Sequence, residues 1–240
     1  MRRRFEVKIM IRPMEIKLDG KKIRIYRAEG ENLPVIYAND DEESGEEVLK
    51  ACTELSCPPF HLVTVSGMDW DESLSPWASA LVVTKEDRFA GKGPEYLEWF
   101  LNKVMPYAEE RLGGKPPVSV ISGYSMAGLF ALWAMYETDA FAGCVCASGS
   151  LWFPGFEAFA KENEFAGQPE GIYLSLGDRE SKTRHPVFRT TEGIFRNLYA
   201  HYTSAGIPAV FELNAGNHFQ DVTVRMAKGY RWILERWEQN

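Results

Sequence analysis

A serine near the middle of the chain stands in the setting of an acyl-transfer nucleophile. Ser125 lies between an apolar, β-branched run at residues 118–122 and an apolar segment at residues 126–137. A strand, a tight turn and a helix in this order are what a nucleophile elbow requires. Gly123 and Ala127 are small, as the close approach of strand and helix at such a turn demands. We therefore predict that Ser125 is a catalytic nucleophile; the plainer alternative is that it only caps the helix.

The backbone around Ser125 is expected to supply the donors that stabilise a developing oxyanion. The N–H of Met126 would lie at the N-terminus of the predicted helix, where the helix dipole favours negative charge. The second donor is expected in the loop after the strand at residues 33–37, and we assign it to Asp41, with Glu42 as the alternative. A backbone N–H needs no particular side chain, but the acidic side chains of this loop would have to point away from an oxyanion.

A serine nucleophile needs a general base, and histidine is the usual one. His218 follows a strand-like segment at residues 209–213 and precedes a helix-like segment at residues 222–237. Active sites of open α/β sheets lie beyond the carboxyl ends of strands, and the order serine, acid, histidine along the chain is that of the α/β-hydrolase fold. We therefore predict that His218 is the base. The other three histidines, which lie before a strand, in a loop and inside a helix, are His61, His185 and His201.

Two carboxylates could orient His218 and stabilise its protonated form. Asp178 and Glu180 both lie just past the strand-like segment at residues 172–176. Their spacing alone does not choose between them. The carboxylate that is not used as the acid is expected to form a surface ion pair with a nearby basic residue.

The elements that must position these residues alternate between strand and helix from about residue 33 onward. This alternation predicts a mostly parallel sheet of roughly eight strands with helices on both faces. Residues 5–14 and 22–27 are joined by Asp19 and Gly20, a hairpin turn signal that predicts an antiparallel N-terminal edge. The remaining predicted strands are residues 33–37, 60–65, 118–122, 144–148, 172–176 and 209–213, the helices are residues 46–55, 94–112, 126–137, 190–205 and 222–237, and residues 67–92 form a long aromatic loop.

Length and composition fit one globular domain, which we assign to residues 1–240. Of the 240 residues, 45% are hydrophobic and 25% are charged, so the chain can fill a core and solvate its surface. The net charge of -7 disfavours nucleic acid as a partner. No apolar run approaches the length of about 18 residues that a membrane span needs. Charged residues interrupt the apolar part of the basic start, so we interpret it as a tail and first strand rather than an export signal.

The four cysteines are expected to be small, reduced core residues. Without an export signal, a cytoplasmic location fits their reduced state best. They form no Cys-x-x-Cys pair, and no histidine is spaced to complete a metal site with them, so we expect no metal and no cofactor. The four are Cys52, Cys57, Cys144 and Cys146.

Six short segments together resemble the esterase branch of the α/β hydrolases. This branch includes enterochelin (siderophore) esterases, feruloyl and acetylxylan esterases and S-formylglutathione hydrolase. The similarity covers nearly the whole chain and is greatest to siderophore-esterase-like hydrolases. The segments are residues 35–37, 74–77, 123–128, 148–152, 176–180 and 216–219.

The resemblance implies further assignments. In relatives the acid falls three residues after the glycine that ends its strand, which favours Glu180. Trp77 and Trp152 would line the substrate cleft. The chain departs from its relatives at Asp40 and Asp41, where they often have Asp-Gly or His-Gly. No long insertion occurs where lipases carry lids, so we expect an open cleft without a large lid.

Together these features predict a serine esterase of the α/β-hydrolase fold that acts on a small-molecule ester. His218 would take the proton of Ser125 while the serine oxygen attacks the carbonyl, and water would then cleave the acyl-enzyme. A siderophore ester or an aryl or acyl-sugar ester is the expected substrate class. The alternatives are a thioesterase or acyltransferase with the same triad, or a non-catalytic ligand-binding member of the fold.

Overall fold

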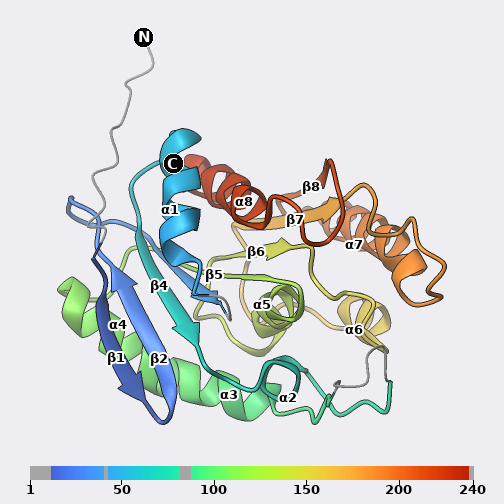
Figure 1. Cartoon of the computed structure of the whole chain (residues 1–240), viewed down its shortest axis with the longest axis horizontal. Helices are drawn as coiled ribbons and strands as arrows, with labels where there is room; N and C mark the ends of the chain where they lie inside the picture. The colour runs from blue at the N-terminus through green and yellow to red at the C-terminus, as the bar shows by residue number, and fades with distance from the viewer. Residues whose placement is uncertain (1–11, 41–42, 82–87, 238–240) are drawn as a thin grey trace.

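One eight-stranded sheet organises the part of the chain that the computed structural model describes, residues 12–40, 43–81 and 88–237 (Figure 1). The strands are β1 (Met14–Leu18), β2 (Lys21–Tyr26), β3 (Val35–Asn39), β4 (His61–Ser66), β5 (Ser119–Tyr124), β6 (Gly143–Ala147), β7 (Gly171–Gly177) and β8 (Ala209–Asn214). They lie in the order β1-β2-β4-β3-β5-β6-β7-β8. β2 pairs antiparallel with β1 and β4, and the other neighbours pair parallel. The predicted sheet, mostly parallel with an antiparallel N-terminal edge, is confirmed.

The N-terminal hairpin forms around the predicted turn. Asp19 and Gly20 both have positive φ angles, 49° and 81°, as a two-residue hairpin turn needs. Leu18 pairs with Lys21 across the turn, so the first strand ends immediately before it. Most of the segment predicted to form this strand, residues 5–14, lies outside the described residues, and the strand that the structure describes begins at Met14.

Helices cover both faces of the sheet, as the alternating pattern predicts. They are α1 (Gly45–Glu54), α2 (Trp70–Leu74), α3 (Gly93–Trp99), α4 (Met105–Leu112), α5 (Met126–Glu137), α6 (Phe156–Glu162), α7 (Thr191–Ser204) and α8 (Val222–Trp237). α1 and α8 pack on each other and share the apolar core of one face. The other face carries α3 to α7 over a larger apolar core. The first turns of α1 and α8 follow the carboxyl ends of β3 and β8, and both contribute to one pocket there.

Three elements differ from the predicted ones. A π-helical turn at Phe100–Val104 interrupts the segment predicted as one helix, residues 94–112. Pro106, at the start of α4, has no N–H to donate to the preceding turn, which accounts for the wider turn. The helix ends at Leu112, the predicted bound, and Gly113 follows it in a left-handed conformation. The sequence pattern does not reveal α2 and α6, because each is too short to display helical periodicity.

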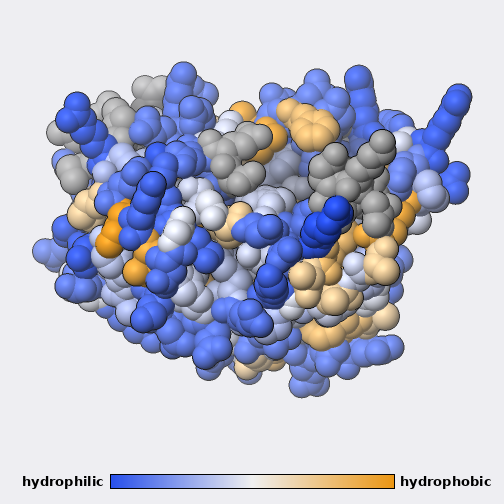
Figure 2. Space-filling model, turned by 60° about the horizontal axis from the view of Figure 1, so that its bottom comes forward, coloured by the Kyte–Doolittle hydropathy of each residue, from blue (hydrophilic) through white to orange (hydrophobic). Residues whose placement is uncertain are grey.

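Most buried side chains are apolar, and almost all charged side chains are at least partly exposed. The four cysteines are buried and free, as predicted, and burial raises the pKa of the Cys144 and Cys146 thiols. The face shown in Figure 2 is mostly hydrophilic, with smaller apolar patches between the polar groups. No helix in the described part of the chain is long and apolar enough to cross a membrane.

Candidate active site

The predicted nucleophile, acid and base gather at one edge of the sheet. Ser125 follows β5, Glu180 follows β7 and His218 follows β8. Because these strands are parallel, the loops after them leave the sheet at its same edge. Side chains separated by 93 positions in the sequence, Ser125 and His218, are thereby brought into contact.

The turn at Ser125 has the strained geometry of a nucleophile elbow. Ser125 has φ 59° and ψ -124°, a conformation that costs a residue with a side chain about 1–3 kcal/mol. A Cβ on Gly123 would lie 2.2 Å from the carbonyl carbon of Ala127, and one on Gly128 would lie 2.9 Å from the Cα of Gly149. Only glycine fits at these two positions, because strand, helix and the loop after β6 nearly touch there.

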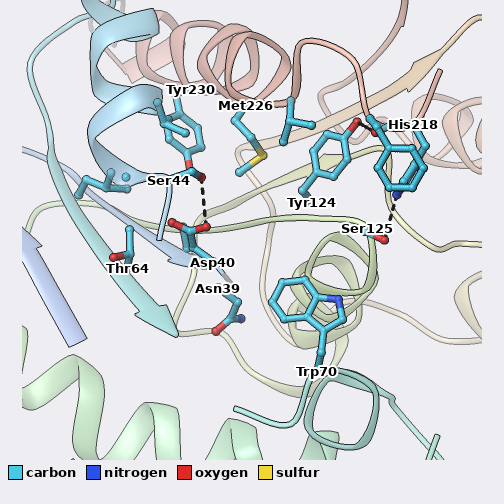
Figure 3. Close-up of a pocket in the computed structure, with 16 residues that line it drawn as sticks. Asn39, Asp40, Ser44, Thr64, Trp70, Tyr124, Ser125, His218, Met226 and Tyr230 are labelled. Carbon is cyan, nitrogen blue, oxygen red and sulfur yellow. Dashed lines mark hydrogen bonds between the residues drawn. The ribbon is translucent and has the colours of Figure 1, made fainter. Parts of the chain in front are cut away.

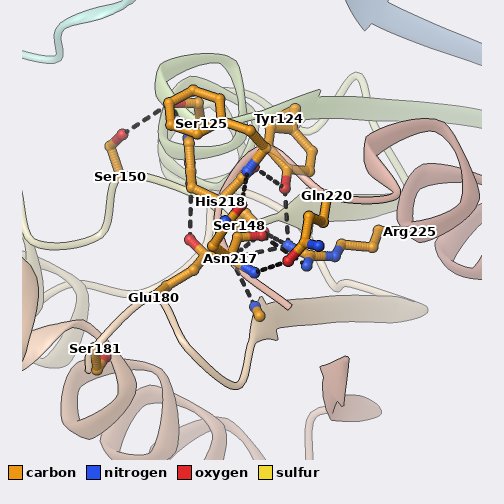
Figure 4. Close-up of polar contacts among 12 residues, drawn as sticks. Tyr124, Ser125, Ser148, Ser150, Glu180, Ser181, Asn217, His218, Gln220 and Arg225 are labelled. Atoms are coloured by element: carbon orange, nitrogen blue, oxygen red, sulfur yellow. Dashed lines mark hydrogen bonds and ion pairs between the residues drawn. The ribbon is translucent and has the colours of Figure 1, made fainter. Parts of the chain in front are cut away.

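Hydrogen bonds link the three side chains in a line (Figure 4). His218 Nε2 lies 3.2 Å from Ser125 Oγ, and His218 Nδ1 lies 2.7 Å from Glu180 Oε2. The Glu180 side chain is only 7% exposed, whereas that of His218 is 31% exposed. The carboxylate is therefore shielded behind the imidazole, and the imidazole and hydroxyl face the open side.

Glu180 rather than Asp178 reaches the histidine. Asp178 instead accepts a hydrogen bond from the Gly216 N–H at 2.8 Å, and its other oxygen lies 4.0 Å from Lys182 Nζ. Asp178 thus ties the loop of His218 to the loop of Glu180. Of the two carboxylates that the spacing leaves open, Glu180 has the geometry of a triad acid and Asp178 has that of a loop anchor.

The environment of Glu180 favours its ionised form. Burial alone would raise the pKa of this carboxyl, but hydrogen bonds from His218, the Gly177 N–H and Ser148 outweigh burial and lower the pKa below its ordinary value. An ionised Glu180 is what a protonated His218 would need as its partner.

The described backbone presents one of the two predicted oxyanion donors. Met126 is the first residue of α5, so its N–H has no carbonyl acceptor within the helix. The Asp40 N–H donates to Val65 O at 2.9 Å and is not available to a substrate. The predicted second donor, Asp41, lies outside the described residues. The Asp40 carboxylate accepts a hydrogen bond from Ser44 Oγ at 3.1 Å, at the N-terminus of α1 where negative charge is favoured.

A pocket of about 240 Å³ opens beside Ser125 and His218, between α1 and α8. Figure 3 shows Ser125 and His218 on one side of it and Asp40 and Ser44 on the other. Trp70, from α2, also lines it. Most of the remaining wall is apolar and comes from Ala38, Val48, Leu62, Phe219, Val222 and Met226.

The structure does not bring Trp77 or Trp152 to this pocket. The Trp77 ring packs against aromatic rings of the segment around α6, and its Nε1–H donates to Pro154 O at 3.0 Å. The Trp152 ring packs edge-on against Phe188 and Phe89. Both rings belong to an aromatic cluster whose members do not line this pocket, so substrate contact by either stays a prediction. The aromatic residues that do line the pocket are Trp70, Tyr124, Phe219 and Tyr230.

One buried side chain at the site has no counterpart among the predicted residues. Arg225 on α8 is 1% exposed and contacts Glu180. Its position is visible in the sequence only as a charge on the buried face of an amphipathic helix, since Val222, Met226 and Gly229 flank it at helical spacing. Motif matching offers no sign of it.

Among the other histidines, His61 is part of the framework rather than of the site. It begins β4, at the opposite end of the strand from the site, and its Nδ1 accepts the Ala28 N–H at 3.1 Å. Burial lowers the pKa of His61 to about 4. Within the described ranges, no group of histidine, cysteine, aspartate or glutamate side chains could hold a metal ion.

Comparison with known proteins adds a family and a set of fold relatives. A family model described as "Putative esterase" matches residues 20–208. No curated protein matches significantly. Among solved structures, an IroE-like serine hydrolase from Shewanella oneidensis superposes with a TM-score of 0.77 at 16% identity, over 93% of this chain and 80% of that one.

Two further solved structures are similar. The siderophore hydrolase EstA from Aspergillus nidulans gives a TM-score of 0.72 at 17% identity and covers 96% of this chain and 94% of its own. The enterobactin esterase FES from Shigella flexneri gives a TM-score of 0.73 at 18% identity, over 95% of this chain and 59% of that one. At sequence identities this low, the similarity to these three structures shows a shared fold only.

Proposed function

This chain belongs to the "Putative esterase" family, and on that premise we propose that Ser125, His218 and Glu180 are the catalytic triad of a carboxylic ester hydrolase. The family match and the fold relatives agree with the resemblance found in the sequence: the chain is an esterase of the α/β-hydrolase fold. The observation that carries the assignment of the triad is the unbroken line of hydrogen bonds from Glu180 Oε2 through the imidazole to Ser125 Oγ.

The proposed reaction passes through an acyl-enzyme. His218 Nε2 accepts the Ser125 proton as Oγ attacks the ester carbonyl, and Glu180 Oε2 holds Nδ1–H so that Nε2 points at the hydroxyl. The Met126 N–H and a second donor, which we assign to Asp41, stabilise the oxyanion. The alcohol leaves with the proton from His218. Water, deprotonated by the same imidazole, then attacks the acyl carbon; the bond to Ser125 Oγ breaks, His218 returns the proton to that oxygen, and the acid is released.

A fluorophosphonate probe tests this assignment directly, because it phosphonylates an activated serine. Wild-type enzyme is expected to be labelled once per chain, at Ser125, as located by peptide mapping. A good ester substrate should slow the labelling, and heat-denatured enzyme should not be labelled. If the folded enzyme stays unlabelled, or if the label is found on another serine, the assignment of Ser125 is wrong.

The residues that line the pocket favour an uncharged group on the part of the substrate that enters it. It carries the Asp40 carboxylate, and none of the described residues that line it is a lysine or an arginine. A buried carboxylate on the substrate would therefore lose water without gaining a cation. Siderophore esters, suggested by the names of two fold relatives, and aryl or acyl-sugar esters remain the proposed substrate class, with an uncharged group in this pocket.

Two matched pairs of esters test the preference for an uncharged group. Each pair compares a neutral ester with a matched ester that carries a carboxylate. In the first pair the carboxylate is on the acyl side: p-nitrophenyl hexanoate is compared with the p-nitrophenyl monoester of adipic acid. In the second pair the carboxylate is on the alcohol side. On the side that occupies the pocket, the neutral ester is expected to have a kcat/KM about tenfold higher or more, corresponding to about 1.4 kcal/mol. Asp40→Asn should narrow that ratio. Equal rates within both pairs would contradict the preference while leaving the triad untouched.

We further propose that the chain acts as one domain in the cytoplasm. All eight described strands join a single sheet, and both apolar cores pack against it, so the described segments form one structural unit. The four buried cysteines are free thiols, as a reducing compartment would keep them.

A further inference from the structure

Arg225 is a buried charge that needs an explanation. It is the most deeply buried charged residue of the described chain, at 1% exposure. Removing a guanidinium from water is costly unless ionic and hydrogen-bonding partners replace the water. Figure 4 shows its end group directed from α8 toward Glu180 and the loop of His218.

The guanidinium contacts all three segments that carry the proposed triad. Nη1 donates to Glu180 Oε1 at 3.0 Å, and it also lies 2.9 Å from the hydroxyl of Tyr124, the residue before Ser125. Nη2 donates to the carbonyl oxygens of Asn217 at 2.8 Å and Ala215 at 3.2 Å, in the loop that carries His218. One planar group thus joins the end of β5, the loop after β7 and the loop after β8.

On the acid, Arg225 helps to give the two carboxylate oxygens different partners. Oε1 accepts from Arg225, from Ser148 Oγ at 2.8 Å and from the Gly177 N–H at 2.6 Å. Oε2 is left for His218 Nδ1. Rotation of the carboxylate would break the three hydrogen bonds to Oε1, so these bonds keep Oε2 aimed at the imidazole.

On the base, Arg225 holds the chain immediately before the imidazole. Asn217 O is bound directly by Nη2. His218 O accepts the Tyr124 hydroxyl at 2.7 Å, and that hydroxyl in turn accepts from Arg225 Nη1. The backbone that carries the imidazole is therefore held at two carbonyl groups, those of Asn217 and His218. Arg225 itself touches neither the imidazole nor Ser125.

We propose that Arg225 is a positioning residue, which sets the reactive geometry of the triad by clamping Glu180 and the His218 loop to the end of β5. The proposal rests on the proposed triad. Arg225 does not line the pocket beside Ser125. Loss of the Arg225 side chain should therefore lower the rate of the chemical step and leave the affinity for the substrate nearly unchanged.

Two substitutions at this site and a matched control separate geometry from general stability. Arg225→Met is expected to lower kcat on the order of 10²-fold, the size of effect that a misplacement of about 1 Å produces, with KM within about threefold of wild type. Arg225→Lys keeps the charge but not the planar fork, so it should recover part of that loss. Arg231→Met, on the same helix and paired only with Glu235 among the described contacts, should leave kcat within about twofold.

A double-mutant cycle with Glu180→Gln distinguishes positioning from a merely structural role. Because part of the clamp acts through Glu180, Arg225→Met should reduce kcat by a clearly smaller factor in the Glu180→Gln background than in the wild-type background. Rates are compared per folded enzyme, below the melting temperature of each variant, and Arg225→Lys replaces Arg225→Met in the cycle if the methionine variant does not fold. A wild-type kcat in Arg225→Met, or the same fold loss in both backgrounds, would overturn the proposal. A wild-type kcat in Glu180→Gln alone would instead count against the triad.

Discussion

Ser125→Ala is expected to lower kcat for p-nitrophenyl esters on the order of 10³–10⁶-fold, the range seen when a triad nucleophile is removed. The Ser125 hydroxyl lies 3.2 Å from His218 Nε2, and alanine leaves the imidazole with no nucleophile to activate. The oxyanion donors and the pocket remain, so some catalysis above the uncatalysed rate should persist. The variant should still bind substrate and unfold close to the wild-type temperature, because alanine tolerates the strained backbone about as well as serine does.

Ser150→Ala is the matched control for this loss. Its hydroxyl lies 3.5 Å from Ser125 Oγ and is buried, but it makes no contact with His218 in the described structure. The control should retain kcat within about tenfold of wild type, since it removes one neutral hydrogen bond of about 1 kcal/mol. A comparable loss in both variants would mean that a damaged loop, rather than a missing nucleophile, is what the Ser125 substitution reports.

Glu180→Gln is expected to reduce kcat on the order of 10²–10⁴-fold, whereas Asp178→Asn should reduce it less than tenfold. The amide of glutamine keeps the volume of Glu180 but removes the charge that stabilises a protonated His218, and it can present an N–H where the imidazole needs an acceptor. Asp178 contacts the Gly216 N–H instead, and an asparagine oxygen can still accept that hydrogen bond. Each variant replaces one carboxylate oxygen with an amide nitrogen, and the two positions lie only two residues apart, so the comparison is closely matched.

The pH dependence of the free energy of unfolding gives a second test of Glu180. The pKa of Glu180 is lowered in the folded protein. The stability that its ionised form contributes is therefore fully present above the ordinary pKa of 4.5 and is lost as the pH falls through the lower folded value. Urea unfolding between pH 7 and pH 3 should show this acid-side loss for wild type and a smaller one for Glu180→Gln. If Asp178→Asn proves the more damaging substitution to kcat, the acid is Asp178.

The fold was largely predictable because the signals that carry it are local. Residues 126–137 and 222–237 form helices with the predicted bounds. Asp19 and Gly20 make the predicted turn, since positive φ is a property of the turn residues themselves. The interruption of residues 94–112 was not predicted, because one wider turn shifts the helical spacing by only about one residue and only the place of Pro106 hints at it.

The positions of the two tryptophans were predicted less well than the meeting of Ser125, Glu180 and His218. Trp77 and Trp152 lie in loops after strands, where a ligand is expected, yet their rings turn into an aromatic cluster away from the pocket described beside Ser125. The direction of a loop side chain depends on partners far away in the sequence, such as Phe153 and Phe188. No pattern within the loop itself records those partners.

The sequence by itself determined the elbow at Ser125 and the choice of His218, because a strand, a turn and a helix are contiguous and parallel strands end at one edge. Residue spacing left open which carboxylate faces the imidazole; the family resemblance favoured Glu180, and only the tertiary structure gives the physical reason. Asp178 and Glu180 follow the same strand at nearly the same distance, and only hydrogen bonds from Gly216, Ser148 and Arg225, all more than thirty positions away from their partners, turn one toward the loop and the other toward His218.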